Sequence, residues 1–176
     1  MISTGHAASL DALLFAARTH KDQRRKGNGE PYINHLIEVA ALLARVGGVE
    51  DADVLSAAVL HDVIEDTPVT AAEVERAFGA RVRALVEAVT DDERLPKAER
   101  KRLQIEHMRH AEADARLIKL ADHCSNVATL PADWSAARRR EYLDWSAEVV
   151  RACAGTNAAL EQEHATRLER ARRDIT

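Results

Sequence analysis

Hydrophobic positions recur along most of the chain with the period of an α-helix. In residues 7–20, Leu10, Leu13, Leu14 and Ala17 fall on one side of a helix. Similar patterns, bounded by glycine, proline or polar turns, continue to the end of the sequence. They predict further helices over residues 33–46, 51–66, 70–78, 80–90, 97–111, 113–130, 134–153 and 157–173.

The helix predicted over residues 51–66 has an almost unbroken apolar middle, Val54 to Leu60, which indicates a central position. Thr70 and Glu73 have the spacing of a capping box at a helix start. No stretch alternates convincingly with the two-residue period of a strand, and no repeat or linker divides the chain. The predicted fold class is therefore all-α, with residues 1–176 forming a single helical bundle.

Composition agrees with this prediction and argues against several function classes. Only 3% of the residues are aromatic, and Ala, Leu and Val dominate the apolar set. The net charge of −4 argues against non-specific nucleic-acid binding. Residues 1–22 lack the features of a signal peptide, and no apolar run approaches the ~18 residues of a membrane helix. Cys124 and Cys153 form no CxxC pair, so we expect a cytoplasmic protein.

Four ionisable residues gather at the end of the helix predicted over residues 51–66. They are His61, Asp62, Glu65 and Asp66. On a continuous helix, His61 and Asp62 lean toward one point, and each has an acidic residue four positions later on about the same face. A divalent cation would offset the cost of this negative charge near a core. The alternative is a helix end that emerges into water, with solvated carboxylates.

Two other predicted helices supply matching groups. His35 opens the second predicted helix, and Asp122 lies inside the strongly apolar helix over residues 113–130. A lone histidine at a helix start is more often a surface or capping residue, but an unpaired aspartate in an apolar helix is costly. With His61 and Asp62, they make a set of two imidazoles and two carboxylates. That set suits manganese, iron or zinc.

Four segments of the chain together resemble a known family. They are HKDQRRKGNGEPYINH, AAVLHDVIEDTPVT, FGARVRALVEAVTD and LIKLADHCSN, and the similarity extends from about Leu10 to Leu160. They are similar to segments of the HD-domain hydrolases of the RelA/SpoT group, which degrade guanosine tetraphosphate and its pentaphosphate relative. The small stand-alone members, including the metazoan SpoT homologue, are the most similar. The resemblance implies an all-helical pyrophosphohydrolase that depends on one divalent metal ion, usually manganese.

The resemblance also implies roles for individual residues. The implied metal ligands are His35, His61, Asp62 and Asp122. The implied catalytic residues, which act on the attacking water, are Glu65 and Asp66. The implied substrate-binding residues are Arg24, Arg25, Lys26 and Asn126, with Lys97, Arg100 and Tyr142 as further candidates.

The chain departs from the family pattern at three positions. Leu36 stands where the family usually has proline, and His123 and Cys124 replace a basic and an apolar residue. None of these departures touches the implied metal ligands. Tyr32 is placed either at the nucleotide pocket or in the core, and the core is favoured; Trp134 is expected to pack in the core. The other histidines expected to be surface or structural residues are His20, His107, His110 and His164.

The expected reaction is hydrolysis of guanosine 3′,5′-bis(diphosphate), or of the pentaphosphate, to GDP or GTP plus pyrophosphate, which lowers the stringent-response alarmone. The expected partners are this small nucleotide and Mn²⁺ or another divalent ion, without nucleic acid or membrane, in a monomer or a homodimer. Two alternatives stay open. One is removal of the 2′-phosphate of NADPH at the same site. The other is a non-catalytic nucleotide sensor, which would be expected to lack a metal ligand or the acidic pair.

Overall fold

The structure is a computed structural model that describes residues 5–175. In this range the only β pairing is an isolated antiparallel bridge between Arg24 and Pro31, which confirms the predicted all-α fold. No helix in the range combines the length and the apolar character needed to cross a bilayer. The helices, in chain order, are α1 (Gly5–Thr19), α2 (Ile33–Arg45), α3 (Ala52–Leu60), α4 (Val63–Asp66), α5 (Ala71–Phe78), α6 (Ala80–Val89), α7 (Lys97–His110), α8 (Ala113–Ala128), α9 (Ala136–Ala152) and α10 (Ala158–Arg173).

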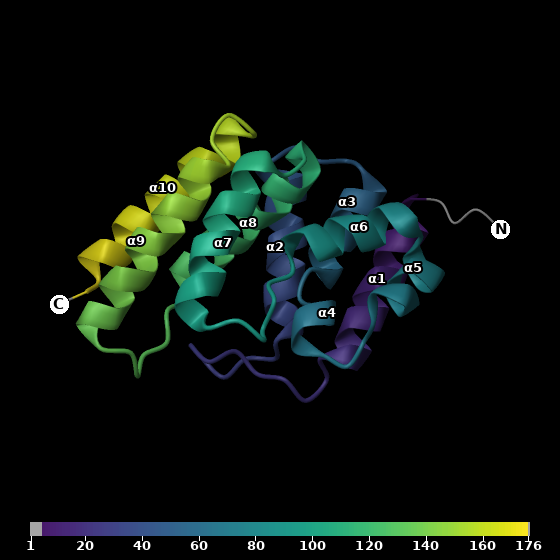
Figure 1. The fold of residues 1–176 in the computed structure, drawn as a ribbon, viewed down its shortest axis with the longest axis horizontal. Helices are drawn as coiled ribbons and strands as arrows, with labels where there is room; N and C mark the ends of the chain where they lie inside the picture. Colours follow the sequence, from purple (N-terminus) through teal and green to yellow (C-terminus); the bar gives the residue numbers. More distant parts are fainter. Residues whose placement is uncertain (1–4, 176) are drawn as a thin grey trace.

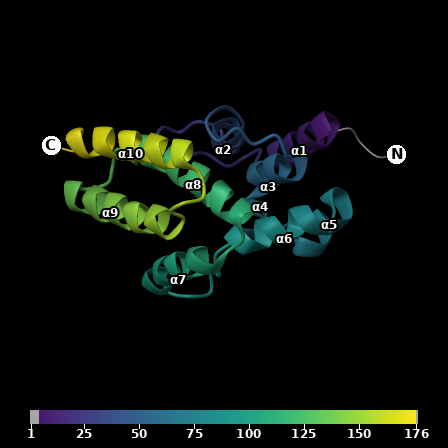
Figure 2. The same ribbon diagram turned by 90° about the horizontal axis from the view of Figure 1, so that it is seen from above.

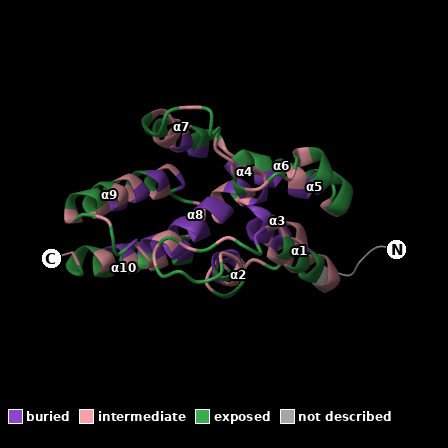
Figure 3. Ribbon diagram, turned by 90° about the horizontal axis from the view of Figure 1, so that it is seen from below, coloured by how far each residue is buried: buried purple, intermediate pink, exposed green. Residues whose placement is uncertain are grey.

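Helix α8 runs through the middle of the molecule and joins two groups of helices (Figure 1, Figure 2). In one group, α2, α3 and α6 contact α8, α1 packs on α3, and α5 packs on α6. In the other group, α9 and α10 contact α8, and α7 packs on α9. Figure 3 shows the buried residues concentrated in α3 and α8. The helices that carry or flank the predicted metal ligands, α2, α3 and α8, therefore meet at the centre of the fold.

Helix α3 lies in the core, as its apolar middle predicts. Val54, Ala57 and Leu60 are each at most 1% exposed. Because α3 packs against α1, α2, α6 and α8, its C-terminal end is fixed relative to those helices. The capping box of α5 is also confirmed, since the side chain of Thr70 accepts from the backbone N–H of Glu73 and the Glu73 carboxylate accepts from that of Thr70.

The predicted continuous helix over residues 51–66 is wrong, because it divides at His61 and Asp62 into α3 and α4. The Nδ1 atom of His61 lies 2.8 Å from the carbonyl oxygen of Ala58. In a continuous helix that oxygen would accept from the N–H of Asp62. The imidazole thus competes for a helical acceptor, and the chain turns at the two residues that matter most for the site. The backbone N–H of Asp66 still bonds the carbonyl of Asp62, at 2.8 Å.

The face of α1 that packs on the core differs from the one that the large apolar residues indicate. Leu10 and Leu14 are 64% and 50% exposed, whereas Ala12 and Ala16 are fully buried. Ala12 and Ala16 belong to the same buried cluster as the core residues of α3, the helix on which α1 packs, and small side chains suit such close packing.

Candidate active site

His35 from α2, His61 and Asp62 from the turn before α4, and Asp122 from α8 converge. The Nε2 atom of His35 is 3.3 Å from Oδ1 of Asp122 and 3.8 Å from Oδ2 of Asp62. The Nε2 atom of His61 is 3.0 Å from Oδ2 of Asp62 and 3.6 Å from Oδ1 of Asp122. Ligand atoms of His35, His61 and Asp62 all lie within 4.8 Å of one another. The structure thus brings together the four residues that the sequence predicts as a metal set.

The orientation of His61 fits a metal ion. A carbonyl oxygen only accepts, so the contact with Ala58 places a proton on Nδ1 and leaves the lone pair of neutral His61 on Nε2. Nε2 is buried, and no described residue meets it in hydrogen-bonding geometry. It faces the oxygens of Asp62 and Asp122, and a lone pair and two carboxylates repel one another without a cation between them. Imidazole and carboxylate donors together suit a divalent transition metal.

Without a metal ion, a proton takes the place of this cation. Burial opposes the charge on His61, but Asp62 and Asp122 outweigh burial and raise the pKa of His61 to about 10. Burial also opposes the charges of Asp62 and Asp122, but the neighbouring imidazoles outweigh it and lower the pKa of both carboxyl groups. A proton and a divalent cation therefore compete for the lone pair on Nε2 of His61.

Lys119 is a buried cation beside the metal set that sequence reasoning missed. It is 5% exposed, and its Nζ donates to the carbonyl of Val89 at 3.0 Å and lies 3.7 Å from Oδ2 of Asp122. Burial opposes its charge, but Asp122 and Asp91 outweigh this effect and raise the pKa of Lys119. The ammonium therefore offsets part of the negative charge. The available signal was a lysine in an apolar helix, one turn before Asp122.

Tyr32 also belongs to the site. Of the two roles considered for it, packing against the core and lining the pocket, the structure shows both. Its hydroxyl donates to Oδ2 of Asp62 at 2.6 Å. Its ring stacks on His20, with 5.3 Å between centroids. His20 is 3% exposed, and its Nδ1 contacts the side chain of Gln23. A layer of polar and aromatic side chains thus supports Asp62 from the side of α1.

Glu65 and Asp66 occupy separate positions near Asp62. Oε2 of Glu65 accepts from the backbone N–H of Asp91 at 2.9 Å, and Oδ2 of Asp66 accepts from Nε2 of Gln23 at 2.9 Å. Burial and the charges of Asp62 and Asp91 raise the pKa of Glu65 to about 7, despite the opposing hydrogen bond. Burial and Asp62 also raise the pKa of Asp66. Glu65 can therefore exchange a proton near neutral pH, and Asp66 keeps its proton to a higher pH than an ordinary aspartate does.

The segment between α1 and α2 brings a basic loop beside these acidic residues. Two backbone hydrogen bonds close the loop. The N–H of Arg25 donates to the carbonyl of Glu30 at 2.9 Å, and the N–H of Tyr32 donates to the carbonyl of Gln23 at 3.0 Å. Gly29 has a φ of 73°, which favours glycine. A Cβ on Gly27 would lie 2.7 Å from the backbone oxygen of Thr129, so only glycine lets the loop lie against the end of α8 without a shift.

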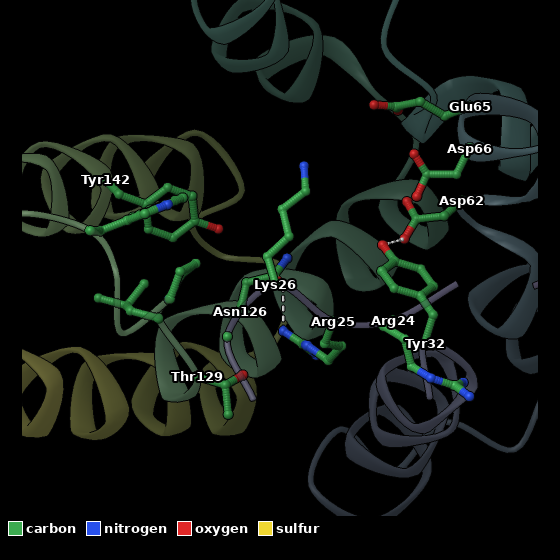
Figure 4. A pocket seen from close by; sticks show the side chains of 14 residues that line it. Arg24, Arg25, Lys26, Tyr32, Asp62, Glu65, Asp66, Asn126, Thr129 and Tyr142 are labelled. Atoms are coloured by element: carbon green, nitrogen blue, oxygen red, sulfur yellow. Dashed lines mark hydrogen bonds between the residues drawn. The ribbon is translucent and has the colours of Figure 1, made fainter. Parts of the chain in front are cut away.

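The loop, the acidic residues, the end of α8, the segment after it and Tyr142 of α9 line an open cavity of about 280 Å³. Figure 4 shows Lys26 extending between Tyr142 on one side and Asp62 and Asp66 on the other. The predicted site residues that line the cavity are Arg24, Arg25, Lys26, Asp62, Glu65, Asp66, Asn126 and Tyr142. One cavity thus presents a carboxylate-rich wall and a basic wall.

Arg25 is already engaged with α8. Its guanidinium donates to Oδ1 of Asn126 at 3.0 Å and to Oγ of Ser125 at 3.3 Å. Asn126 in turn donates from Nδ2 to Oδ1 of Asp122 at 2.6 Å. Arg25 and Asn126 therefore connect the basic loop to the metal set.

Two further candidates lie outside this cavity. Lys97 lines a neighbouring cavity of about 320 Å³, which shares Trp134 and Tyr142 with the first. Arg100 lines neither of these two cavities and lies 3.8 Å from Glu93. Trp134 is only partly buried and lines both cavities, so the prediction that it packs in the core is wrong: its ring lies against Tyr142 and under the Arg138 guanidinium instead.

The unusual residues next to Asp122 point into the core. His123 bonds Ser146 at 2.8 Å and Gln104 at 3.2 Å, and Cys124 is fully buried. Neither lines the cavity. Among the remaining histidines, His107 and His110 are exposed. His164 is buried against Ser146.

Comparison with known proteins agrees with this geometry. The model of the HD-domain family matches residues 12–152. The human guanosine-3′,5′-bis(diphosphate) 3′-pyrophosphohydrolase MESH1 is 52% identical over 161 residues, which cover 89% of this chain and 90% of the human protein. The bifunctional (p)ppGpp synthase/hydrolase SpoT of Escherichia coli is 42% identical over 135 residues, which cover 73% of this chain and 19% of SpoT.

Solved structures show the same relationship. One is described as a metazoan ortholog of SpoT that hydrolyzes ppGpp and plays a role in starvation responses. It matches with a TM-score of 0.90 and 40% identity, over 100% of this chain and 99% of that one. The structure of lmo0812 from Listeria monocytogenes matches with a TM-score of 0.67 and 28% identity, over 83% of this chain and 98% of that one. The chain therefore belongs to the HD-domain family, and within it to the small SpoT-like hydrolases.

Proposed function

We propose that this protein hydrolyses guanosine 3′,5′-bis(diphosphate), and its pentaphosphate relative, to GDP or GTP and pyrophosphate. This reaction lowers the level of the alarmone. The observation that carries the proposal is the convergence of two imidazoles and two carboxylates at a cavity that also presents a basic loop. A chain about half identical to this one, over nine tenths of its length, is named for the same reaction.

His35, His61, Asp62 and Asp122 would hold one divalent cation, which we propose to be Mn²⁺. Such a cation supplies Lewis acidity toward a phosphoryl oxygen and toward water. Tyr32 and Asn126 support this set, because each donates a hydrogen bond to one of its two carboxylates. Lys119 offsets part of the negative charge of these two carboxylates.

The basic loop provides the contacts for the substrate's phosphates. Lys26 extends into the cavity opposite the acidic residues, where its ammonium can pair with phosphate oxygens (Figure 4). Arg24 lines the same wall and can form forked hydrogen bonds to phosphate. The ring of Tyr142 lines the opposite side of the cavity, where a nucleoside can pack. Arg25 acts mainly through Asn126, which it holds against Asp122.

Glu65 is the proposed general base. It takes a proton from the water whose oxygen forms the new bond to the 3′-phosphorus, as the bond from that phosphorus to the ribose 3′-oxygen breaks. The departing oxygen takes up a proton and becomes the 3′-hydroxyl of GDP. The backbone N–H of Asp91 holds the Glu65 carboxylate in place, and a pKa of about 7 suits a base at neutral pH. Asp66 accepts hydrogen bonds from the side chains of Gln23 and Tyr32, and we assign it an orienting role.

A product assay tests this function. Purified protein is incubated with guanosine 3′,5′-bis(diphosphate) and MnCl₂, and in parallel with NADPH at the same concentration. Products are separated by anion-exchange chromatography. We expect equal amounts of GDP and pyrophosphate and a clear preference over NADPH. Preferential release of phosphate from NADPH would overturn the substrate assignment, and binding without turnover of either compound would indicate a sensor.

A further inference from the structure

A chain of hydrogen bonds connects the C-terminal helix with His35. Arg167 of α10 donates from its guanidinium to Oε1 of Glu38 at 2.7 Å. Oε2 of Glu38 lies 2.7 Å from the hydroxyl of Ser125, and that hydroxyl lies 2.8 Å from Nδ1 of His35. The chain thus ends on the side of the His35 ring opposite Nε2, the atom that faces Asp122.

The chemistry of these groups fixes the direction of every bond. Burial opposes the charge of Glu38, but hydrogen bonds from Arg167 and Ser125 outweigh it and lower the pKa of Glu38. Glu38 is therefore a carboxylate and can only accept. Ser125 has one hydroxyl proton and must donate it to Glu38. Its oxygen then accepts from His35 Nδ1, and also from Arg25 at 3.3 Å.

We infer that Glu38 and Ser125 are positioning residues that fix the proton of His35 on Nδ1, so that its Nε2 lone pair points at the metal position. Arg167 anchors Glu38, so α10 contributes to a site from which it is otherwise remote. This inference rests on the proposed role of His35 as a metal ligand. His61 needs no such chain, because the Ala58 carbonyl fixes its proton directly.

Replacement of Glu38 by glutamine is informative because it permits the hydrogen bonds between position 38, Ser125 and His35 to run in the opposite direction. The side-chain amide of the Glu38→Gln variant can donate to Ser125, whose proton would then go to His35 Nδ1, leaving the histidine proton on Nε2. That tautomer cannot bind a metal through Nε2. Replacement of Ser125 by alanine removes the link altogether. Both variants are thus expected to change the tautomer while retaining all four proposed ligands.

The matched control is Glu163→Gln. Glu163 also accepts from Arg167, at 2.6 Å, but it is not part of the chain to His35. The control substitution therefore perturbs the same arginine and should leave His35 unaffected.

The experiment has two readouts that need no nucleotide. Long-range ¹H–¹⁵N NMR of the metal-free, folded proteins reports the His35 tautomer, and Mn²⁺ titration followed by EPR reports affinity. We expect Glu38→Gln and Ser125→Ala to populate the Nε2–H form and to weaken Mn²⁺ binding about 10- to 100-fold, with wild-type behaviour for Glu163→Gln. Wild-type His35 signals in both folded variants would overturn the inference. Since the NMR readout requires no metal ion, failure of the wild-type protein to bind Mn²⁺ would contradict the proposed function separately.

Discussion

The hydroxyl of Tyr32 donates a 2.6 Å hydrogen bond to Oδ2 of Asp62, the same oxygen that lies 3.0 Å from Nε2 of His61. Burial and the charge of Asp62 raise the pKa of Tyr32, so its hydroxyl keeps its proton and remains a donor. Tyr32, which lies just before α2, therefore orients the carboxylate of Asp62 in the turn after α3. This contact couples the basic loop to the metal set.

Removal of this hydroxyl should weaken the site while leaving the fold intact. We expect Tyr32→Phe to lower Mn²⁺ affinity or turnover about 10- to 100-fold, because Asp62 loses the bond that orients it. The ring still packs on His20, so the thermal midpoint should change little. Calorimetric titration with Mn²⁺ and steady-state kinetics measure the effect. Unchanged values for both would show that the bond has no role in orienting Asp62.

Asp122 tests the proposed coordination directly. Replacement by asparagine keeps the shape of the side chain but removes its charge, and Lys119 remains 3.7 Å from that position. We expect metal binding and hydrolysis to disappear together. Asp114→Asn is the control, because it lies on the exposed start of the same helix and pairs with Arg81. Metal content after dialysis distinguishes the two variants, and a fully loaded Asp122→Asn protein would refute the assignment.

Glu65 should control the acid limb of the pH–rate profile. The base must be deprotonated, so the rate should rise with pH through a pKa of about 7, or lower when the metal ion is bound. We expect Glu65→Gln to retain Mn²⁺ but to slow turnover about 10²- to 10⁴-fold. Rates from pH 5 to 9 test both statements. If Asp66→Asn shows this loss and Glu65→Gln does not, the base is Asp66.

His164 should make the fold sensitive to acid. Burial, with a smaller effect of Arg172, lowers the pKa of His164 from 6.5 to about 4. As the pH falls through that window, the unfolded chain takes up a proton that the folded protein does not. The free energy of unfolding should therefore decrease, by up to about 3 kcal/mol from this group.

Urea denaturation at pH 7.5 and pH 4.5 measures this effect. His164→Gln can keep the bond to Ser146 without the titration, so its stability should decline less with acid than that of the wild-type protein. Parallel declines for the two proteins would exclude His164 as the source.

Much of the fold follows from the sequence because helical periodicity is a local signal. Ala12 and Ala16 show one limit of this signal. Whether α1 buries its leucine face or its alanine face depends on how it packs on α3, and periodicity within α1 does not report that. The break in the helix at His61 shows a second limit. It arises because the His61 side chain bonds the Ala58 carbonyl oxygen, and hydrophobic periodicity does not predict such a contact.

The four proposed ligands are predictable because polar residues in apolar helices are costly, and Asp122 is such a residue. Their supporting residues are harder to find. Tyr32, Lys119 and Ser125 are ordinary residue types whose roles depend on distances across the fold. Lys97 and Arg100 show the converse: a basic segment in the sequence made both of them candidates, but neither lines the active-site cavity.

Anomalous diffraction at the manganese edge, from crystals grown with MnCl₂, tests the central assignment most directly. We expect one peak within coordination distance of Nε2 of His35, Nε2 of His61 and carboxylate oxygens of Asp62 and Asp122. A fully occupied ion elsewhere, with these four side chains still packed against one another, would contradict the assignment.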